Sequence, residues 1–514
     1  MDDCWRETVF VSWQTLGRTR PSTNGTKVPL RAPSGRVRGR TGAPLSGHVS
    51  YWKRALESAH HRARTPIPVF PRSRTNDPPG LGAFRALWLA QTISSVGTQL
   101  SLIALPLAAI LYVHAGAFEI GLLAALETLP YLIVSLPVGV LVDRVDRRRL
   151  LIVADLGRAV ALGVVPVAFA LGVGSFALLC LAAIVVGALS VVFTIAQQAY
   201  VPDLLPSDRL IGANQQLEIS DSGARVAGPT LGGAVIGVAG ALVAIASDGA
   251  SYLASALTIM LGTPRSASGR ESNASFEPGV DELGDSLGDA GWLSAMRSGI
   301  LVVARQRILR DLMISTAIFN LASGMVLAQV VLFSTRDLGL GAAEFGLIYG
   351  IGNVGFVAGA LLVGRLERRL GAGALLLAAS TLGAVALGLI GAAGLGLGTA
   401  GLLAGRLVGA LSGPLFNVPL VSLRQIATRD DLRGRVAATF RFVDWGTAPI
   451  GALMSGIIGA AVGLTAVMVL AAGLGVVSTL WIGVGPTRRA RVSQPDLADK
   501  PERRVRLPLS PKPS

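Results

Sequence analysis

The chain has 514 residues, of which 51% are hydrophobic and 15% are charged, and its mean hydropathy is +0.57. Soluble globular proteins carry roughly 25% charged residues, so this composition excludes an ordinary soluble fold. Apolar runs long enough to cross about 30 Å of hydrocarbon recur along the chain, whereas a β-barrel would show short alternating segments. The composition therefore predicts an all-α polytopic membrane protein.

The formal net charge of +15 comes mainly from the two ends of the chain. Residues 1–80 contain 14 Lys and Arg against 5 Asp and Glu, and residues 486–514 contain 8 against 3. Basic ends of this kind are typical of cytoplasmic tails next to anionic lipid. No folded nucleic-acid-binding motif accompanies the charge, so we expect the lipid bilayer and not nucleic acid as the partner.

Cofactor-binding and catalytic patterns are missing from the sequence. The two cysteines, Cys4 and Cys180, and the four histidines predict neither a disulfide framework nor a metal site. Gly396–Gly401 matches the pattern GxGxxG, but it lies between two apolar segments and not in a βαβ unit. We therefore expect no cofactor, no metal and no enzymatic activity.

Twelve membrane helices are expected after a disordered basic tail, residues 1–80. A polar stretch, residues 263–310, interrupts them and predicts a cytoplasmic linker between an N-terminal six-helix lobe (81–262) and a C-terminal six-helix lobe (311–485). A second basic cytoplasmic tail follows at 486–514. The expected helices lie near 84–112, 117–142, 150–172, 175–199, 212–238, 241–262, 311–334, 344–364, 370–393, 398–424, 435–460 and 463–485.

A short basic loop, Gly139–Arg149 with the sequence GVLVDRVDRRR, joins the second and third expected helices. Arginine-rich loops face the cytoplasm, and the loops that alternate with them here contain almost no Lys or Arg. Both termini are therefore expected in the cytoplasm, with the chain in the cell membrane. The same loop is echoed by Gly364–Arg369, so the two lobes are expected to be pseudo-symmetric, with a small-molecule substrate handled between them.

Residues 84–97 (FRALWLAQTISSVG) resemble the first helix of a branch of the major facilitator superfamily, the bacterial drug-efflux branch that includes macrolide and siderophore exporters. The loop Gly139–Arg149 resembles the loop 2–3 signature of the superfamily. The segment that contains Pro414–Asn417, Ser422–Gln425 and Gly434–Val436 resembles the superfamily's helix 10–11 stretch. The resemblance covers roughly residues 82–485. It implies a secondary active transporter, which we expect to be a monomer.

The aspartate of the basic loop predicts a gate. Asp143 ends a helix, where the macrodipole disfavours an acid, so Arg144, Arg147 and Arg148 or another helix N-terminus must compensate it. In families that this chain resembles, the partner is the eleventh helix. Gly139, one turn earlier, permits close backbone approach. We expect a charge latch on the cytoplasmic side; the alternative is that the loop only sets topology.

The fifth expected helix contains Gly228, Pro229, Gly232 and Gly233, which resemble the Gly-Pro-rich signature of antiporter families. Proline removes a helix hydrogen bond, and glycines allow close helix contact. A role in antiport and a merely kinked, tightly packed helix are both consistent with this pattern, and the sequence leaves them open.

Ionisable side chains at membrane depth are candidate functional groups because burying them there is costly. Glu127 lies nearest the midplane, and no opposite charge is near it in sequence, so it is our first candidate for the proton carrier, with Asp248 second. A hydrogen-bonded structural role for Glu127 is the alternative. The other candidates are Asp221 and Arg225, which share a helix face, and Arg406. Asp155 and Arg158 are expected to form a structural pair. In the second lobe, Asp444 is expected to be partnered by Arg441, one turn away.

These observations favour proton-coupled efflux of a small amphipathic compound by alternating access. A metabolite importer or uniporter of the same fold is one alternative. A non-transporting membrane receptor or scaffold is another, although a scaffold would not need an acid at the midplane such as Glu127.

Overall fold

The computed structural model describes residues 80–263, 299–429, 432–485 and 487 of the chain. Most of the two expected tails and most of the expected linker lie outside these residues, and so does the side chain of Asp143. Within the described residues the regular structure is helical. The elements are α3 (Leu81–Tyr112), α4 (Ala117–Ile133), α5 (Ser135–Arg144), α6 (Arg147–Ala170), α7 (Phe176–Leu204), α8 (Ser207–Ala239), α9 (Ala241–Gly262), α12 (Arg307–Arg336), α13 (Ala342–Leu370), α14 (Ala372–Ala392), the short π-helix η1 (Ala393–Leu397), α15 (Gly398–Ala427), α16 (Arg433–Val462) and α17 (Leu464–Val484).

Nine helical segments in the described ranges are long and apolar enough to cross a membrane, and one of these combines α14 with α15. The expected second helix is instead divided into α4 and α5 at Val134. The break has a local cause, because Pro137 cannot donate a hydrogen bond to the carbonyl of Ile133. Residues 299–305, which we expected in the polar linker, are helical, and Val303 is buried against Leu309.

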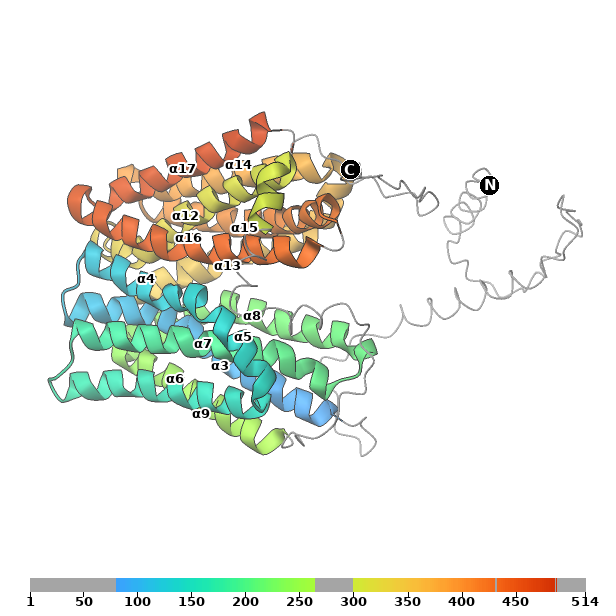
Figure 1. Ribbon diagram of the computed structural model, residues 1–514. Coiled ribbons are helices and arrows are strands. Elements are labelled where there is room, and N and C mark those ends of the chain that lie inside the picture. Colours follow the sequence, from blue (N-terminus) through green and yellow to red (C-terminus); the bar gives the residue numbers. More distant parts are fainter. Residues whose placement is uncertain (1–79, 264–298, 430–431, 486, 488–514) are drawn as a thin grey trace, which may run out of the picture. The chain divides into compact units, whose positions relative to one another are not determined.

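The helices pack in two groups, which we call the N-terminal group (α3–α9) and the C-terminal group (α12–α17); they are coloured blue to green and yellow to red in Figure 1. In the first group α3 packs on α8 and α9, α6 on α7 and α9, and α4 on α7. In the second, α12 packs on α16 and α17, α14 on α15 and α17, and α13 on α15. Each of these pairings in the first group has a counterpart in the second.

The two groups meet along two pairs of helices, α4 with α16 and α8 with α13. Glycines permit both contacts, because a Cβ at Gly121 would lie 2.6 Å from the Cα of Gly456, and a Cβ at Gly233 would lie 2.9 Å from the Cα of Gly346. Backbone therefore packs directly on backbone at both places. This close approach positions the cavity described below.

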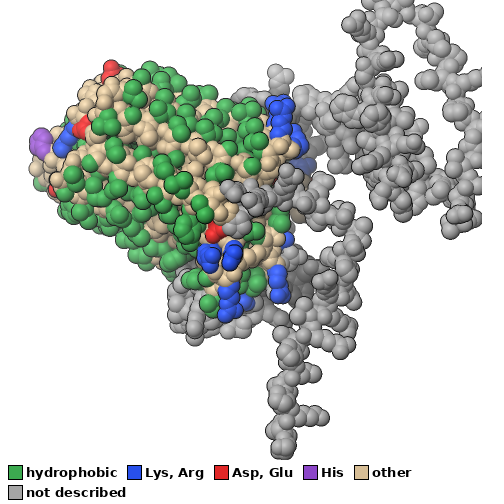
Figure 2. Space-filling model, turned by 90° about the horizontal axis from the view of Figure 1, so that it is seen from above, with side chains coloured by type: hydrophobic (Ala, Val, Ile, Leu, Met, Phe, Trp, Pro, Cys, Tyr) green, Lys and Arg blue, Asp and Glu red, His purple; other side chains and the backbone are tan. Residues whose placement is uncertain are grey.

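The outer surface of the helices is apolar. Hydrophobic side chains cover the broad face seen in Figure 2, and basic side chains gather toward one end. Exposed arginines near the ends of α5 and α13 include Arg144, Arg365, Arg368 and Arg369. A broad exposed apolar surface with charged side chains at its two ends is what a bilayer-spanning protein presents to lipid. The chain is a multi-pass membrane protein.

Candidate functional site: the cavity between the helix groups

A cavity of about 120 Å³ lies between the N-terminal and C-terminal groups. Helices α3, α4 and α8 contribute one side of it, and α12, α13 and α16 contribute the other. Most of the lining side chains are aliphatic or aromatic, and Glu127 is the only carboxylic acid among them. The cavity therefore suits an apolar ligand, with a single group that can exchange a proton or bind a positive charge.

The Glu127 side chain projects from the middle of α4 and makes no hydrogen bond or ion pair with any residue that the structure describes. Its backbone carbonyl packs against Gly187 of α7, where a Cβ would clash with the carbonyl oxygen. One turn further along α4, the ring of Tyr131 meets Trp445 of α16 edge-on, with ring centroids 5.8 Å apart. The acid thus lies beside a direct contact between the two groups.

A chain of polar contacts crosses the second junction, between α8 and α13. Arg225 pairs with Asp221 on α8 at 2.8 Å, and the carbonyl of Arg225 accepts a hydrogen bond from the Asn353 side-chain amide of α13 at 2.5 Å. The Asn353 side-chain oxygen accepts from Arg406 of α15 at 2.6 Å. The Arg406 guanidinium lies 4.0 Å from the ring centre of Tyr349, which lines the cavity. Three predicted site residues are therefore connected through Asn353, which the sequence analysis missed.

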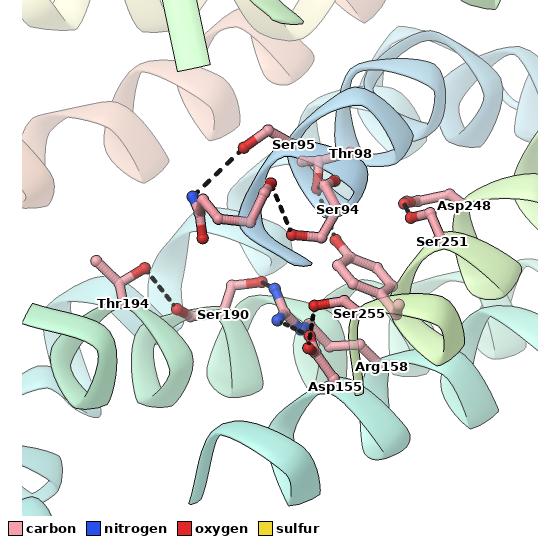
Figure 3. A network of polar contacts seen from close by, with 12 residues as sticks. Ser94, Ser95, Thr98, Asp155, Arg158, Ser190, Thr194, Asp248, Ser251 and Ser255 are labelled. Carbon is pink, nitrogen blue, oxygen red and sulfur yellow. Dashed lines mark hydrogen bonds and ion pairs between the residues drawn. The ribbon is translucent and has the colours of Figure 1, made fainter. Parts of the chain in front are cut away.

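A buried ion pair lies inside the N-terminal group (Figure 3). Asp155 and Arg158 of α6 are paired, and Ser255 of α9 donates to the second carboxylate oxygen of Asp155 at 2.6 Å. The Arg158 guanidinium lies between the rings of Phe193 and Tyr252, 4.5 Å and 4.2 Å from their centres. These contacts tie α6 to α7 and α9, as a structural pair would.

Asp248 is fully buried on α9, at the contact with α3, and is not among the cavity-lining residues. Ser251 donates to one carboxylate oxygen at 3.1 Å, and the other oxygen has no partner in the described part of the chain. Gly97 of α3 makes room for the acid, since a Cβ there would clash with the carboxylate. The structure thus separates the two candidate proton carriers, with Glu127 in the cavity and Asp248 inside the N-terminal group.

The arginines of the basic loop hold α6 against its neighbours. Arg147 pairs with Asp203 of α7 at 2.7 Å, and Arg148 donates to Thr263 at 2.9 Å and to the carbonyl of Met260 at 2.7 Å, at the end of α9. Arg144 is exposed at the end of α5, which also contains Gly139. The predicted latch depends on the side chain of Asp143, which is not described.

The Gly-Pro motif of α8 is packed on two sides. A Cβ at Gly228 would clash with the side chain of Gln99 on α3, and Gly232 also faces α3. Gly233 faces the backbone of α13, and Pro229 lines the cavity. This motif therefore brings α8 close both to its own group and to the opposite one.

One expected pair in the C-terminal group is replaced by another contact. Asp444 accepts a hydrogen bond from Asn320 of α12 at 3.1 Å, and not from Arg441 one turn away as expected. The geometric reason is that α12 packs along α16, which brings Asn320 to this face. No cluster of His, Cys, Asp and Glu suited to a metal ion occurs among the residues that the structure describes.

A cavity at the junction of two similar helix groups, in a chain that spans the membrane several times, is an arrangement typical of secondary transporters. The model of the Major Facilitator Superfamily matches residues 87–444, which is more than half of the chain. The chain belongs to this superfamily.

Two bacterial relatives are described as uncharacterised transporters of the same type. YfiS of Bacillus subtilis (strain 168) is 25% identical over 358 residues, which cover 68% of this chain and 80% of YfiS. The protein y4rN of Sinorhizobium fredii (strain NBRC 101917 / NGR234) is 27% identical over 393 residues, which cover 75% of this chain and 90% of y4rN.

Solved structures with the same fold include the nucleoside transporter NupG, with a TM-score of 0.60, 13% identity, and coverage of 78% of this chain and 98% of that one. A bacterial homologue of the human lysosomal transporter Spinster, in an inward-facing and unoccupied conformation, has a TM-score of 0.60, 15% identity, and coverage of 80% and 98%. A bacterial homologue of the iron transporter ferroportin, in an inward-facing state, has a TM-score of 0.58, 16% identity, and coverage of 78% and 97%. At these identities the likeness concerns the fold alone.

Proposed function

We propose that the protein is a proton-coupled exporter of small amphipathic compounds and works by alternating access. The observation that carries this proposal is the position of Glu127, a carboxylic acid without a partner among the described residues, in an otherwise apolar cavity between the helix groups. An unpaired carboxylate is costly in such surroundings, so the group either holds a proton or faces a positive charge on a ligand. Exchange between these two states couples proton entry to export.

The proposed architecture has twelve membrane spans in two pseudo-symmetric lobes of six, with lobe boundaries at 81–262 and 311–485. Counting α4 with α5 as one broken span, α8 as a polar span, and α14 and α15 as two spans gives this number. The lobes correspond to the N-terminal and C-terminal groups. The basic ends and the basic 139–149 loop favour cytoplasmic termini in the cell membrane, and we propose a monomer.

The direction of transport and the substrate class rest on sequence. Residues 84–97 resemble the first helix of the drug-efflux branch that includes macrolide and siderophore exporters, and the Gly228-Pro229 pair of α8 resembles an antiporter signature. We therefore propose a small amphipathic compound or drug as substrate. A metabolite importer or uniporter of the same fold is the alternative, since the fold is shared with a transporter of a metabolite class, the nucleoside transporter NupG.

Transport in everted membrane vesicles tests this proposal. A macrolide, a catecholate siderophore and a lipophilic cationic dye are offered in turn, with and without an imposed pH gradient. Everted vesicles present the cytoplasmic face to the medium, so an exporter accumulates its substrate when the interior is acidic. Accumulation that a protonophore abolishes supports the proposal. Equal uptake with and without the gradient contradicts coupling, and loss of preloaded compound contradicts export.

A further inference from the structure

A backbone carbonyl of α8 lacks its usual hydrogen-bond donor. In an α-helix each N–H donates to the carbonyl four residues earlier, and proline has no N–H. Pro229 therefore leaves the carbonyl of Arg225 without an intrahelical partner. The Asn353 side-chain amide of α13, which belongs to the opposite helix group, donates to this carbonyl at 2.5 Å. The proline thus creates an acceptor that a residue of the other group uses.

The oxygen of the Asn353 side-chain amide makes a second contact, toward the cavity wall. It accepts a hydrogen bond from Arg406 at 2.6 Å, and the Arg406 guanidinium lies 4.0 Å from the ring centre of Tyr349. Tyr349 lines the cavity and packs on Phe345, with ring centroids 4.4 Å apart. The Asn353 side chain therefore binds two groups. One is the Arg225 carbonyl on α8, across the α8–α13 junction, and the other is Arg406, which lies against the cavity-lining ring of Tyr349.

Glycines allow α8 and α13 to approach closely enough for this contact. A Cβ at Gly350 would lie 3.0 Å from the carbonyl oxygen of Val226 and would clash with the Thr230 hydroxyl. On the other side of α13, a Cβ at Gly352 would lie 2.6 Å from the Cβ of Arg406, so this glycine permits the close approach of α15. The positions next to Tyr349 and Asn353 in sequence are thus kept free of side chains.

We propose that Asn353 is a positioning residue that couples the aromatic wall of the cavity to closure of the α8–α13 junction. Its amide nitrogen joins α13 to α8 by donating to the Arg225 carbonyl, which Pro229 leaves without an intrahelical donor. Its amide oxygen holds Arg406 over Tyr349. A ligand that displaces Tyr349 moves Arg406 and withdraws the donor to the Asn353 amide oxygen, which loosens the junction. The role in transport rests on the proposed alternating-access function, whereas the contact itself is testable without transport.

Disulfide cross-linking across the junction tests the proposal. The background is the Cys4→Ser/Cys180→Ser chain, into which Gly237→Cys on α8 and Ala343→Cys on α13 are introduced. The Cβ positions of residues 237 and 343 lie 3.3 Å apart, close to the separation that a disulfide needs. The rate of cross-linking in membranes, with an oxidant and without substrate or gradient, reports how closed the junction is.

Asn353→Leu is expected to slow cross-linking about fivefold, the equivalent of about 1 kcal/mol for one lost hydrogen bond. In the Pro229→Ala background the N–H of residue 229 returns to the Arg225 carbonyl, so Asn353→Leu should cause no further loss. Asn320→Ala is the matched control, because Asn320 binds Asp444 within the C-terminal group and should leave the rate unchanged.

A second comparison tests the link to the cavity. Tyr349→Leu removes the ring under Arg406. It should slow cross-linking in the parent chain and leave the rate unchanged in the Asn353→Leu chain. Asn353→Asp is a second variant, because it keeps the acceptor for Arg406 and loses the donor to the Arg225 carbonyl. A monodisperse peak in size-exclusion chromatography establishes that each variant is folded. Additive effects of Pro229→Ala and Asn353→Leu, or a Tyr349→Leu effect that persists without Asn353, would overturn the proposal. Since no substrate is used, these outcomes are independent of whether the protein exports by proton coupling.

Discussion

Two glycines on α8, Gly233 and Gly223, differ in how closely other atoms surround them, and alanine substitution should distinguish them. A Cβ at Gly233 would lie 2.5 Å from the carbonyl oxygen of Ala342 and 2.9 Å from the Cα of Gly346, both on α13. A Cβ at Gly223, ten residues earlier on the same helix, meets nothing within 4 Å. The two sites therefore differ in packing and share the same helical backbone.

The expected sizes follow from these distances. Forcing a methyl group into a filled backbone contact costs about 1–3 kcal/mol, because α8 and α13 must separate. Replacing glycine by alanine in an uncrowded helix instead gains up to about 1 kcal/mol. Gly233→Ala should lower the thermal unfolding midpoint of the purified protein, whereas Gly223→Ala should leave it equal or higher.

The assay is thermal unfolding in detergent, followed by tryptophan fluorescence, together with the cross-linking of the Gly237→Cys/Ala343→Cys pair described above. Gly233→Ala should lower both the midpoint and the cross-linking rate. If the two alanine variants have the same midpoint and the same cross-linking rate, the backbone contact between the helix groups does not exist as described.

Variants of two charged sites, Asp143 and the Asp155–Arg158 pair, test further predictions. Asp143→Asn should abolish transport while membrane insertion, measured by protease protection, stays intact; full transport by this variant contradicts the latch. Asp155→Asn or Arg158→Met alone should destabilise the protein by about 3–5 kcal/mol, because each leaves an unpaired buried charge, and the double variant should recover most of the loss in thermal unfolding. A double variant less stable than both single variants would mean that the pair does more than neutralise itself.

The positions of the helices could be predicted from the sequence because apolar length and the arginine-rich loops are local signals. The start of α9 and the end of α3 agree with the expected helices, whereas the division at Val134 required attention to Pro137. The short α4 and α5 show that hydropathy alone does not reveal where a spanning helix breaks.

The candidate site could be predicted only in part, because its connections are made between distant helices. Glu127 stood out as a lone acid in an apolar segment, and the structure adds that it lines the cavity. Asn353 is a neutral residue on a glycine-rich helix, and its only signal was an amide at membrane depth. Asp444 was expected to pair with Arg441 on the same helix, but it accepts a hydrogen bond from Asn320 of α12, which packs on α16. Contacts of this kind depend on which helix faces are opposed, and sequence spacing within one helix does not reveal that.

Proton coupling through Glu127 is tested most directly by comparing Glu127→Gln with Glu119→Gln in everted vesicles. Both acids lie on α4, but Glu119 caps the start of the helix through the backbone N–H of Gly116 at 2.9 Å and does not line the cavity. Glu127→Gln should abolish accumulation driven by a pH gradient, and Glu119→Gln should retain it. Full gradient-driven accumulation by the Glu127→Gln variant would contradict the assignment of Glu127 as the proton carrier.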